Sequence, residues 1–448
     1  MRWEHPVQFA SQSDVGFRRR NNEDSISVRI CKDQESWRDH GHFFLVADGM
    51  GGHAVGELAS KIASETVPHT FFKNKPGPVA KSLKSAIEVA NQAINERGMA
   101  NREFMRMGTT CSSLCLCSEG AVIGHVGDSR VYRVRENRID QLTFDHSLQW
   151  ELIRQGRMKP EEVYLNEPRN VITRSLGPEP VVKVDIEGPY LVMEGDRYIL
   201  CSDGLTSHLK DDEIGMIAKY LEPSDACRLM INLANLRGGS DNISVIVVRV
   251  GELPDGNLAQ ERHPEQEPEP ELDLEKGYGE WLWLAGVWGA SLMVATGIVM
   301  WILTKFDRGE FLTFGGMSLL VMLLVRKVFS QRESGRHEEY LDKSKTVEWK
   351  PYRSERLKFN TDFLQYLTTM ESELQRAAME EEWTIEWSAH NKIYYEAKEG
   401  LEKKKYLNAF RDFSRAIDIL MTGLHSYRKE MVHQARWKKG SSSTPQED

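Results

Sequence analysis

Short apolar runs alternate with helical stretches over the first 251 residues. The runs are rich in β-branched and aromatic residues and include HFFLVAD from 42, TCSSLCLC from 110, RYILCS from 197 and ISVIVVRV from 243. Two stretches, 76–97 and 211–236, have helical spacing instead. Because turn-length gaps separate many of the runs, we expect mostly antiparallel sheets covered on the outside by helices. Residues 1–251 are therefore predicted to form one α+β domain, an antiparallel sandwich flanked by helices.

Beyond this domain the pattern changes. Residues 252–280 are rich in Pro and Glu and poor in large apolar side chains, which predicts an extended, acidic linker. Residues 338–437 have helical periodicity and predict an all-α region, whereas the Ser-rich, charged residues 438–448 are typical of a disordered tail. Residues near 390–420 resemble one tetratricopeptide repeat; an ordinary helical bundle is the alternative. A protein partner for these helices is a further expectation.

Two apolar runs separate the linker from the helical region. Residues 281–304 carry no charge. As a helix, a run of this length is about long enough to cross roughly 30 Å of hydrocarbon. The second run, 311–325, is shorter, but Arg326 and Lys327 could extend it to residue 329 by snorkelling. We interpret the pair as a two-helix transmembrane hairpin, 281–304 and 311–329, in contact with membrane lipid. A buried or re-entrant helix pair in a soluble protein is the alternative.

The flanking charges predict an orientation for this hairpin. Arg326, Lys327, Arg332 and Arg336 follow the second run and favour a cytosolic side. The first residues have no apolar core and no cleavage site of a secretory signal. These features predict a multi-pass protein of the cytoplasmic membrane, with the N-terminal and C-terminal domains both in the cytosol.

Composition excludes several functions. The net charge is −9, and nucleic-acid binding, which needs a concentrated basic face, is not expected. The six cysteines have no CxxC spacing, so neither a zinc site nor a disulfide framework is indicated.

Acidic residues stand where apolar runs meet turns. Any one of them could simply mark a turn, because Asp and Gly are common where strands end. If the junctions share one end of the sheets, however, the carboxylates converge and repel one another unless a cation neutralises them. Oxygen ligands without His or Cys suit Mg²⁺ or Mn²⁺, and the glycines after Asp48 leave room for an ion and its water. The residues of this predicted metal cluster are Glu23, Asp24, Asp48, Gly49, Asp128, Asp203 and Asp241.

Eight motifs in a fixed order resemble those of the bacterial branch of the metal-dependent protein phosphatase 2C family. The resemblance covers residues 8–251 and implies a β-sandwich flanked by helices, with two Mn²⁺ or Mg²⁺ ions at one end. It also implies hydrolysis of phosphoserine and phosphothreonine. The motifs are SDVGFRRRNNED, VADGMGGHAVGELAS, MGTT, GHVGDSRVYR, DHS, NVITRSLG, CSDGLTSHL and GGSDNISVIVV.

The resemblance implies roles for the matching residues. Asp48 would bridge the two metals with help from the Gly49 carbonyl, and Asp203 and Asp241 would hold one of them. Glu23 would bind the water shell of the other, and Asp24 would belong to the same cluster. Asp128 together with Asp203 resembles the pair that binds a third, weaker ion. Arg19 stands four residues before Glu23, as does the phosphate-binding arginine of the family, and its planar fork can hold two phosphate oxygens.

Two departures from the family leave roles open. Eukaryotic relatives carry a His directly after the Asp-Gly, where this chain has Met50, with His53 three residues later, so the leaving-group acid is unassigned. They also have an Asp where this chain has Ser207, which predicts a weaker third site. Residues 146–175 correspond to the family's flap, where we interpret His146 and Trp150 as structural residues.

These features predict a serine/threonine protein phosphatase that uses metal-activated water and forms no phosphoenzyme. Its expected partners are proteins phosphorylated on Ser or Thr, a Ser/Thr kinase or its targets among them. The alternatives are an inactive phosphopeptide-binding module and a scaffold whose C-terminal helices do the main work.

Overall fold

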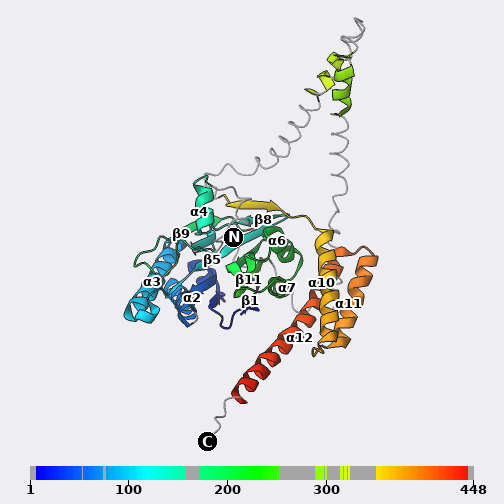
Figure 1. Cartoon of the computed structure of the whole chain (residues 1–448). Coiled ribbons are helices and arrows are strands. Elements are labelled where there is room, and N and C mark those ends of the chain that lie inside the picture. The colour runs from blue at the N-terminus through cyan, green and yellow to red at the C-terminus, as the bar shows by residue number, and fades with distance from the viewer. Residues whose placement is uncertain are drawn as a thin grey trace. The chain divides into compact units, whose positions relative to one another are not determined.

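A computed structural model describes most of the first 251 residues and a second long stretch near the C-terminus (Figure 1). The described residues are 7–52, 54–73, 77–157, 171–251, 288–296, 298–299, 313–315, 317–319, 321–322 and 350–441. His53, the linker 252–280 and much of the flap therefore lie outside them. Contacts group Met1–Glu269 with Glu348–Asp448 in one compact unit, and Pro270–Val347 in another.

The first unit is built on two antiparallel sheets. One has the strand order β1-β11-β10-β7-β8-β12; the other has the order β2-β3-β5-β6-β9, with β4 beside β3. The strands are β1 (Val7–Asp14), β2 (Asp24–Arg29), β3 (His42–Met50), β4 (Gly108–Thr109), β5 (Cys111–Cys117), β6 (Gly120–Val126), β7 (Arg130–Arg135), β8 (Arg138–Gln141), β9 (Asp185–Tyr190), β10 (Arg197–Cys201), β11 (Ile243–Val250) and β12 (Arg353–Arg356).

Alternation along the strands explains why the two sheets stack. In β3, Phe44 and Val46 pack between the sheets, against residues such as Leu200 and Ile246 of the opposite sheet. The intervening Phe43 and Leu45 point to the other face and join the core under the helices. Both faces of β3 are therefore buried, as expected for a strand whose residues are apolar in continuous sequence. The predicted antiparallel sandwich is confirmed.

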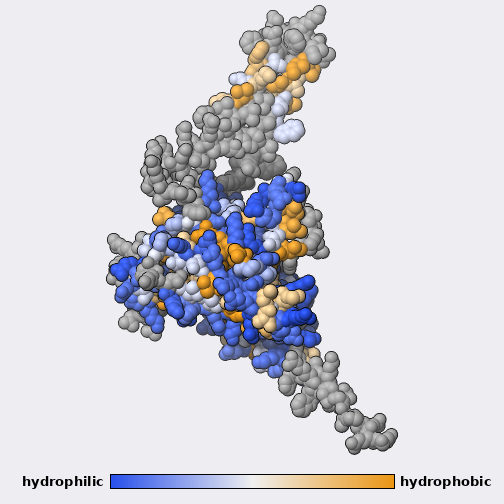
Figure 2. All heavy atoms as spheres, turned by 90° about the vertical axis from the view of Figure 1, so that its left-hand side faces the viewer, coloured by the Kyte–Doolittle hydropathy of each residue, from blue (hydrophilic) through white to orange (hydrophobic). Residues whose placement is uncertain are grey.

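Helices cover the outer faces of the sandwich. The helical elements up to residue 236 are α1 (Gln34–Asp39), α2 (Ala54–Lys73), α3 (Val79–Ala100), the 3₁₀ turn η1 (Arg102–Phe104), α4 (Leu148–Arg154), α5 (Asp203–Thr206), α6 (Asp211–Tyr220) and α7 (Pro223–Leu236). α2 and α3 pack on the sheet of β3, whereas α6 and α7 pack on the sheet of β11 (Figure 1). The face that includes α2 and α3 is largely hydrophilic, with small hydrophobic patches (Figure 2).

The predicted helix 211–236 is two helices. α6 ends at Tyr220, and α7 begins at Pro223, which stands in its first turn. A proline disfavours helical backbone in the residue before it and has no N–H to donate, so a helix can start at this position but cannot run through it. The break turns the chain and lets both helices lie on the same sheet.

The C-terminal region corrects the prediction of an all-α region. It begins with a strand, β12, which pairs antiparallel with β8 and so forms the edge of the sheet that contains β11. Three helices follow, α10 (Thr361–Glu380), α11 (Trp387–Glu402) and α12 (Tyr406–Ser441). Their apolar faces share one hydrophobic core with α6, α7 and β11, in which Phe410, Leu229 and Val247 are all buried.

The predicted transmembrane hairpin is wrong on the described residues, and with it the multi-pass assignment. Among the parts of the chain that the structure describes, no helix has both the length and the apolar character to cross a membrane. Residues 281–287 and 301–312 lie outside the described residues.

Candidate active site

Two acidic residues face each other across neighbouring strands at one end of the sandwich. Asp24, the first residue of β2, is the register partner of Asp48 near the end of β3. Directly opposed residues of an antiparallel pair have Cβ atoms about 5 Å apart, a distance at which like charges destabilise the sheet. This pairing therefore needs a compensating charge, and it is a sequence-distant contact that spacing alone could not reveal.

The backbone of Asp48 is fixed by the two threonines of the MGTT motif. The amide of Asp48 donates to Thr110 Oγ1 at 2.9 Å. Its carbonyl accepts from the Thr110 amide and from Thr109 Oγ1, both at 2.8 Å. Thr110 Oγ1 also lies 2.7 Å from Ser129 Oγ. These bonds hold the strand end without using the carboxylate, which is left to face the pocket.

Asp203 and Asp241 reach the same end from the opposite sheet. Asp203 starts the short helix α5 directly after β10, and Asp241 stands two residues before β11, which pairs with β10. The turn is tight at Gly204, where a Cβ would lie 2.0 Å from the Asn242 carbonyl oxygen. Only glycine fits there, so the residue after Asp203 is dictated by the approach of the two strand ends.

Asn242 ties the loop that carries Arg19 and Glu23 to this site. Its Oδ1 accepts from the Glu23 amide at 2.8 Å, and its amide group donates to the carbonyls of Val15 and Asn21 at 2.8 and 2.9 Å. The Gly49 amide donates to the Glu23 carbonyl at 3.1 Å. Glu23 is thus brought beside β3 by backbone bonds.

The converging segments surround a pocket of about 290 Å³. Four of the predicted acidic or metal-binding positions line it together with Gly49 and the predicted phosphate-binding arginine. Its lining residues are Arg19, Arg20, Asn21, Glu23, Asp48, Gly49, Met50, Gly51, Gly52, Ile172, Asp203, Asp241 and Asn242. Asp24 and Asp128 do not line the pocket; both are buried.

Burial and repulsion by neighbouring carboxylates raise the pKa values of Asp24, Asp48 and Asp203. Burial is the largest cause in each case. It raises the pKa of Asp24 to about 7, with Asp203 and Asp241 adding to the effect, and that of Asp203 to about 6, with Asp241 adding. The pKa of Asp48 lies well above its usual range for the same reasons, and after burial the largest contribution comes from Asp24. Holding all these groups ionised at neutral pH therefore requires positive charge.

The residues present fit divalent cations. Asp24 Oδ1 and Asp128 Oδ1 are buried oxygens without a hydrogen-bond partner, although Asp24 Oδ2 accepts from Ser202 Oγ at 2.8 Å. Buried acceptors are costly to leave unpaired. Over the residues described, no group of three or more acidic, His or Cys side chains is arranged closely enough to hold a metal ion by itself. Mg²⁺ and Mn²⁺ keep several water ligands, so an open set of carboxylates suits them better than a closed cage.

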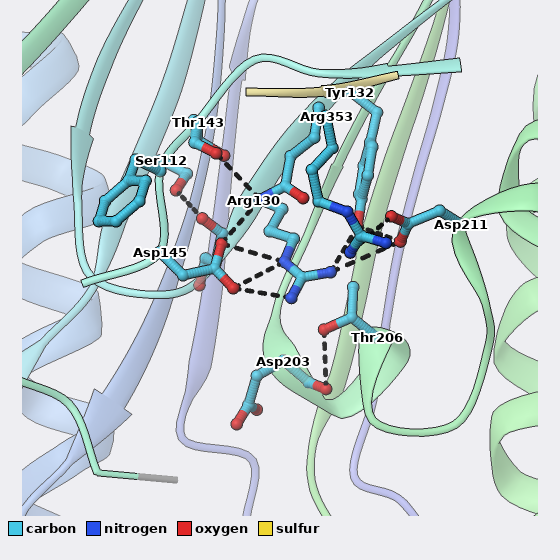
Figure 3. Close-up of polar contacts among 12 residues, drawn as sticks. Ser112, Arg130, Tyr132, Thr143, Asp145, Asp203, Thr206, Asp211 and Arg353 are labelled. Carbon is cyan, nitrogen blue, oxygen red and sulfur yellow. Dashed lines mark hydrogen bonds and ion pairs between the residues drawn. The ribbon is translucent and has the colours of Figure 1, made fainter. Parts of the chain in front are cut away.

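Asp128 lies next to a buried ion-pair network rather than on the pocket wall. Arg130 donates to Asp145 from Nε and Nη2, the shortest bond being 2.7 Å, and its Nη1 lies 3.5 Å from Asp211 Oδ1. Figure 3 shows Arg130 between Asp145 and Asp211, and Arg353 of β12 also pairs with Asp211. Burial, followed by Asp203 and Asp145, raises the pKa of Asp128 well above its usual range. Asp128 is therefore close enough to Asp203 to interact electrostatically.

Arg19 is exposed at the pocket mouth and pairs with an acid of the cluster. Its Nη2 donates to Asp241 Oδ2 at 2.8 Å, and its Nε donates to the Ser240 carbonyl at 3.3 Å. Its side chain is 46% exposed. Asp241 also accepts from the Asn242 amide at 2.9 Å. Arg19 thus neutralises an acid that was predicted only as a metal ligand.

Several residues that build the site were not singled out from the sequence. Asn242, Ser202, Thr110 and Gly56 position the acids without carrying charge themselves. A Cβ on Gly56 would lie 2.2 Å from Glu23 Oε2, so this glycine lets α2 pass close to the carboxylate. The sequence marks these residues only by placing them inside the quoted motifs, close to the acids. Their spacing does not distinguish them from ordinary turn residues.

His146 lies in a buried cluster away from the pocket lining. Its Nδ1 accepts from the Gly127 amide at 2.9 Å, and Nε2 lies 3.0 Å from Asp185 Oδ2. Trp150 is buried as well, under the guanidinium groups of Arg130 and Arg353. These contacts agree with structural roles for both residues.

Comparison with known proteins gives the family. A protein phosphatase 2C family model matches residues 21–236. A putative protein phosphatase 2C-type of Streptococcus pyogenes is 33% identical over 246 residues, which cover 54% of this chain and 97% of that protein. The serine/threonine protein phosphatase PstP of Mycobacterium tuberculosis is 32% identical over 248 residues. The chain therefore belongs to the protein phosphatase 2C family.

Two solved phosphatase structures align with just over half of this chain. The serine/threonine phosphatase Stp1 of Staphylococcus aureus aligns with a TM-score of 0.50 and 29% identity over 55% of this chain and 96% of that chain. The catalytic domain of PstP, solved in complex with two manganese ions, aligns with a TM-score of 0.47 and 31% identity over 55% and 99%. The PstP match covers 54% of this chain but only 45% of the whole PstP protein.

Proposed function

We propose that the protein is a metal-dependent serine/threonine protein phosphatase that hydrolyses phosphoserine and phosphothreonine without a phosphoenzyme. The observation that carries this proposal is the convergence of Glu23, Asp48, Asp203 and Asp241 on one pocket with Arg19 at its mouth. Family membership supports the same reaction. The substrates are phosphorylated proteins, with a Ser/Thr kinase or its targets as candidates. A protein partner of the C-terminal helices stays a prediction.

The acids divide into two groups in this proposal. Asp48, Asp203, Asp241 and the Gly49 carbonyl would hold Mn²⁺ or Mg²⁺ directly, and Glu23 would accept from water around the ions. Asp24 lies behind Asp48 and adds negative charge, and Asp128 with Asp203 would form a weaker third site. When bound, a pair of such ions would lower the pKa of water and so supply a nucleophile near neutral pH.

The remaining chemistry belongs to the chain's own side chains. Arg19 would hold two phosphoryl oxygens through its planar fork and offset the negative charge that grows on them. The bonds of Ser240 and Asp241 to Arg19 keep its guanidinium at the pocket mouth. The threonines that clamp Asp48 and the Asn242 side chain that clamps Glu23 keep the acids in place during turnover.

Turnover of a phosphothreonine peptide by the full chain tests this function. We expect release of inorganic phosphate that depends on Mn²⁺ or Mg²⁺ and stops with a chelator. The reaction should form no covalent phosphoenzyme. Acid quenching of turnover with a radiolabelled phosphopeptide should therefore leave no label on the enzyme. Binding of the phosphopeptide without any turnover would instead favour the inactive binding module.

Gly56→Ala should raise the Mn²⁺ concentration needed for half-maximal activity by about tenfold, an effect typical of residues that orient metal ligands. The new Cβ would stand 2.2 Å from Glu23 Oε2 and 2.9 Å from the Gly49 backbone, so it must displace the Glu23 carboxylate and press on the strand end that carries Gly49. Alanine is a better helix former than glycine, so α2 itself should not weaken. Manganese titrations of activity measure the effect, with Lys61→Ala, an exposed position one turn further along α2, as the control. Equal manganese midpoints for Gly56→Ala and the wild type would contradict this prediction.

A further inference from the structure

The last helix of the chain touches the loop that carries Arg19. In α12, Arg428 donates from Nη2 to the Phe17 carbonyl oxygen at 2.8 Å. Its guanidinium carbon lies 3.9 Å from the centre of the Phe17 ring, a cation–π contact. The His425 ring meets the same Phe17 ring edge to face, with centroids 5.4 Å apart. Two residues of α12 therefore hold Phe17 from its backbone and its ring.

Phe17 in turn fixes the backbone from which Arg19 extends. The amides of Phe17 and Arg18 both donate to the Gly239 carbonyl, at 2.9 and 3.0 Å. The next residue of that turn, Ser240, accepts from Arg19 Nε at 3.3 Å. The loop and the turn also approach closely at Gly16, whose φ is +79° and where a Cβ would lie 2.1 Å from the Asp241 carbonyl oxygen. Displacement of Phe17 would thus move Arg19 relative to Asp241.

α12 is itself anchored on the catalytic domain. Asp418 accepts from Asn232 Nδ2 at 3.2 Å and pairs with Arg228 Nε at 3.0 Å. One turn earlier, Arg415 Nε donates to Asp225 Oδ2 at 3.2 Å. On the same part of α12, Phe413 and Ile417 are fully buried in the core shared with α7. A helix held along this length gives Arg428 a fixed base from which to hold the loop.

We propose that Arg428 is a positioning residue for the phosphatase reaction: it clamps Phe17 so that Arg19 stays at the pocket mouth, ready to bind the phosphoryl group. The C-terminal helices would then be a working part of the catalytic unit, reaching the site from more than 400 residues along the chain. This proposal rests on the function proposed above, because it assigns Arg19 to phosphate binding. It concerns contacts outside the family-matched residues 21–236.

Arg428→Ala in the full chain tests the proposal. We expect KM for a phosphothreonine peptide to rise about three- to tenfold, as for loss of a cation–π contact and one charged hydrogen bond, with kcat within about twofold. Arg428→Lys keeps the positive charge but not the planar guanidinium, so its KM should lie between those of the wild type and Arg428→Ala. The control is Lys429→Ala, the exposed neighbour on the same helix. In an Arg19→Ala background, Arg428→Ala should have no further effect on KM.

Hydrogen exchange separates failure of this proposal from failure of the proposed function. Arg428→Ala should speed exchange at the Phe17 and Arg18 amides, a readout that needs no turnover, while Lys429→Ala leaves it unchanged. A wild-type chain without phosphatase activity would refute the proposed function but not the contact of Arg428 with Phe17. Unchanged exchange at these amides, or an unchanged KM in an active enzyme, would overturn the clamp.

Discussion

Asp48→Asn is expected to lower kcat/KM for a phosphothreonine peptide by about 10³-fold or more, the scale of losing a central electrostatic group. Asparagine has nearly the same shape as aspartate. The bonds that fix this position use the backbone atoms of residue 48 with Thr109 and Thr110, so the substituted side chain should stay in place. What disappears is the negative charge proposed to hold the divalent ions. Steady-state kinetics at saturating Mn²⁺ measures the loss.

A second readout of the same variant does not need activity. Burial, followed by Asp24 and Asp203, raises the pKa of Asp48 well above its usual range, so a charge at this position is unfavourable without a cation. In a chelator the variant should therefore melt no lower than the wild type. Mn²⁺ should raise the melting temperature of the wild type and raise that of the variant less. Glu65→Gln, an exposed charge removal on α2, is the control. Wild-type turnover by Asp48→Asn would refute the metal assignment.

The parts of the site that sequence could predict are those that carry charge at a strand end. Asp48, Asp203 and Asp241 stand at junctions between apolar runs and turns, and the pocket brings all three together. The sandwich was predictable for the same reason, because short apolar runs with turn-length gaps permit few arrangements. The pairing of Asp24 with Asp48 was not, since strand register depends on contacts that no local pattern encodes.

The errors arise where a local pattern fits more than one tertiary environment. The helical periodicity of 338–437 predicted apolar faces correctly, but it could not say that those faces pack on α6 and α7. Residues 353–356 are polar and charged, so no alternation marked them as a strand; they pair because β8 offers an open edge. The uncharged run 281–304 indicated a membrane span by composition alone, whereas among the described residues no helix is long and apolar enough to cross a membrane.

Phe410→Ala is expected to lower the free energy of unfolding of the whole first unit by about 3–5 kcal/mol, the usual cost of deleting a buried aromatic side chain. The Phe410 ring is fully buried in α12, 6.1 Å from the ring of Phe359 and 6.2 Å from that of Phe363. The same core continues into Ile214 of α6 and Leu229 of α7. With a total stability of about 5–15 kcal/mol, such a loss should shift the urea midpoint strongly.

Urea unfolding tests whether the C-terminal helices and the phosphatase sandwich form one folding unit. If they and the phosphatase sandwich share one core, the urea midpoint of Phe410→Ala should fall equally by circular dichroism and by residual phosphatase activity. Tyr395→Ala removes an aromatic side chain that is 68% exposed on α11, and its midpoint should stay close to that of the wild type. A variant that loses helical signal early but keeps wild-type resistance of activity to urea would mean that the helices form a separate folding unit. The clamp from Arg428 to Phe17 could not then depend on the shared core.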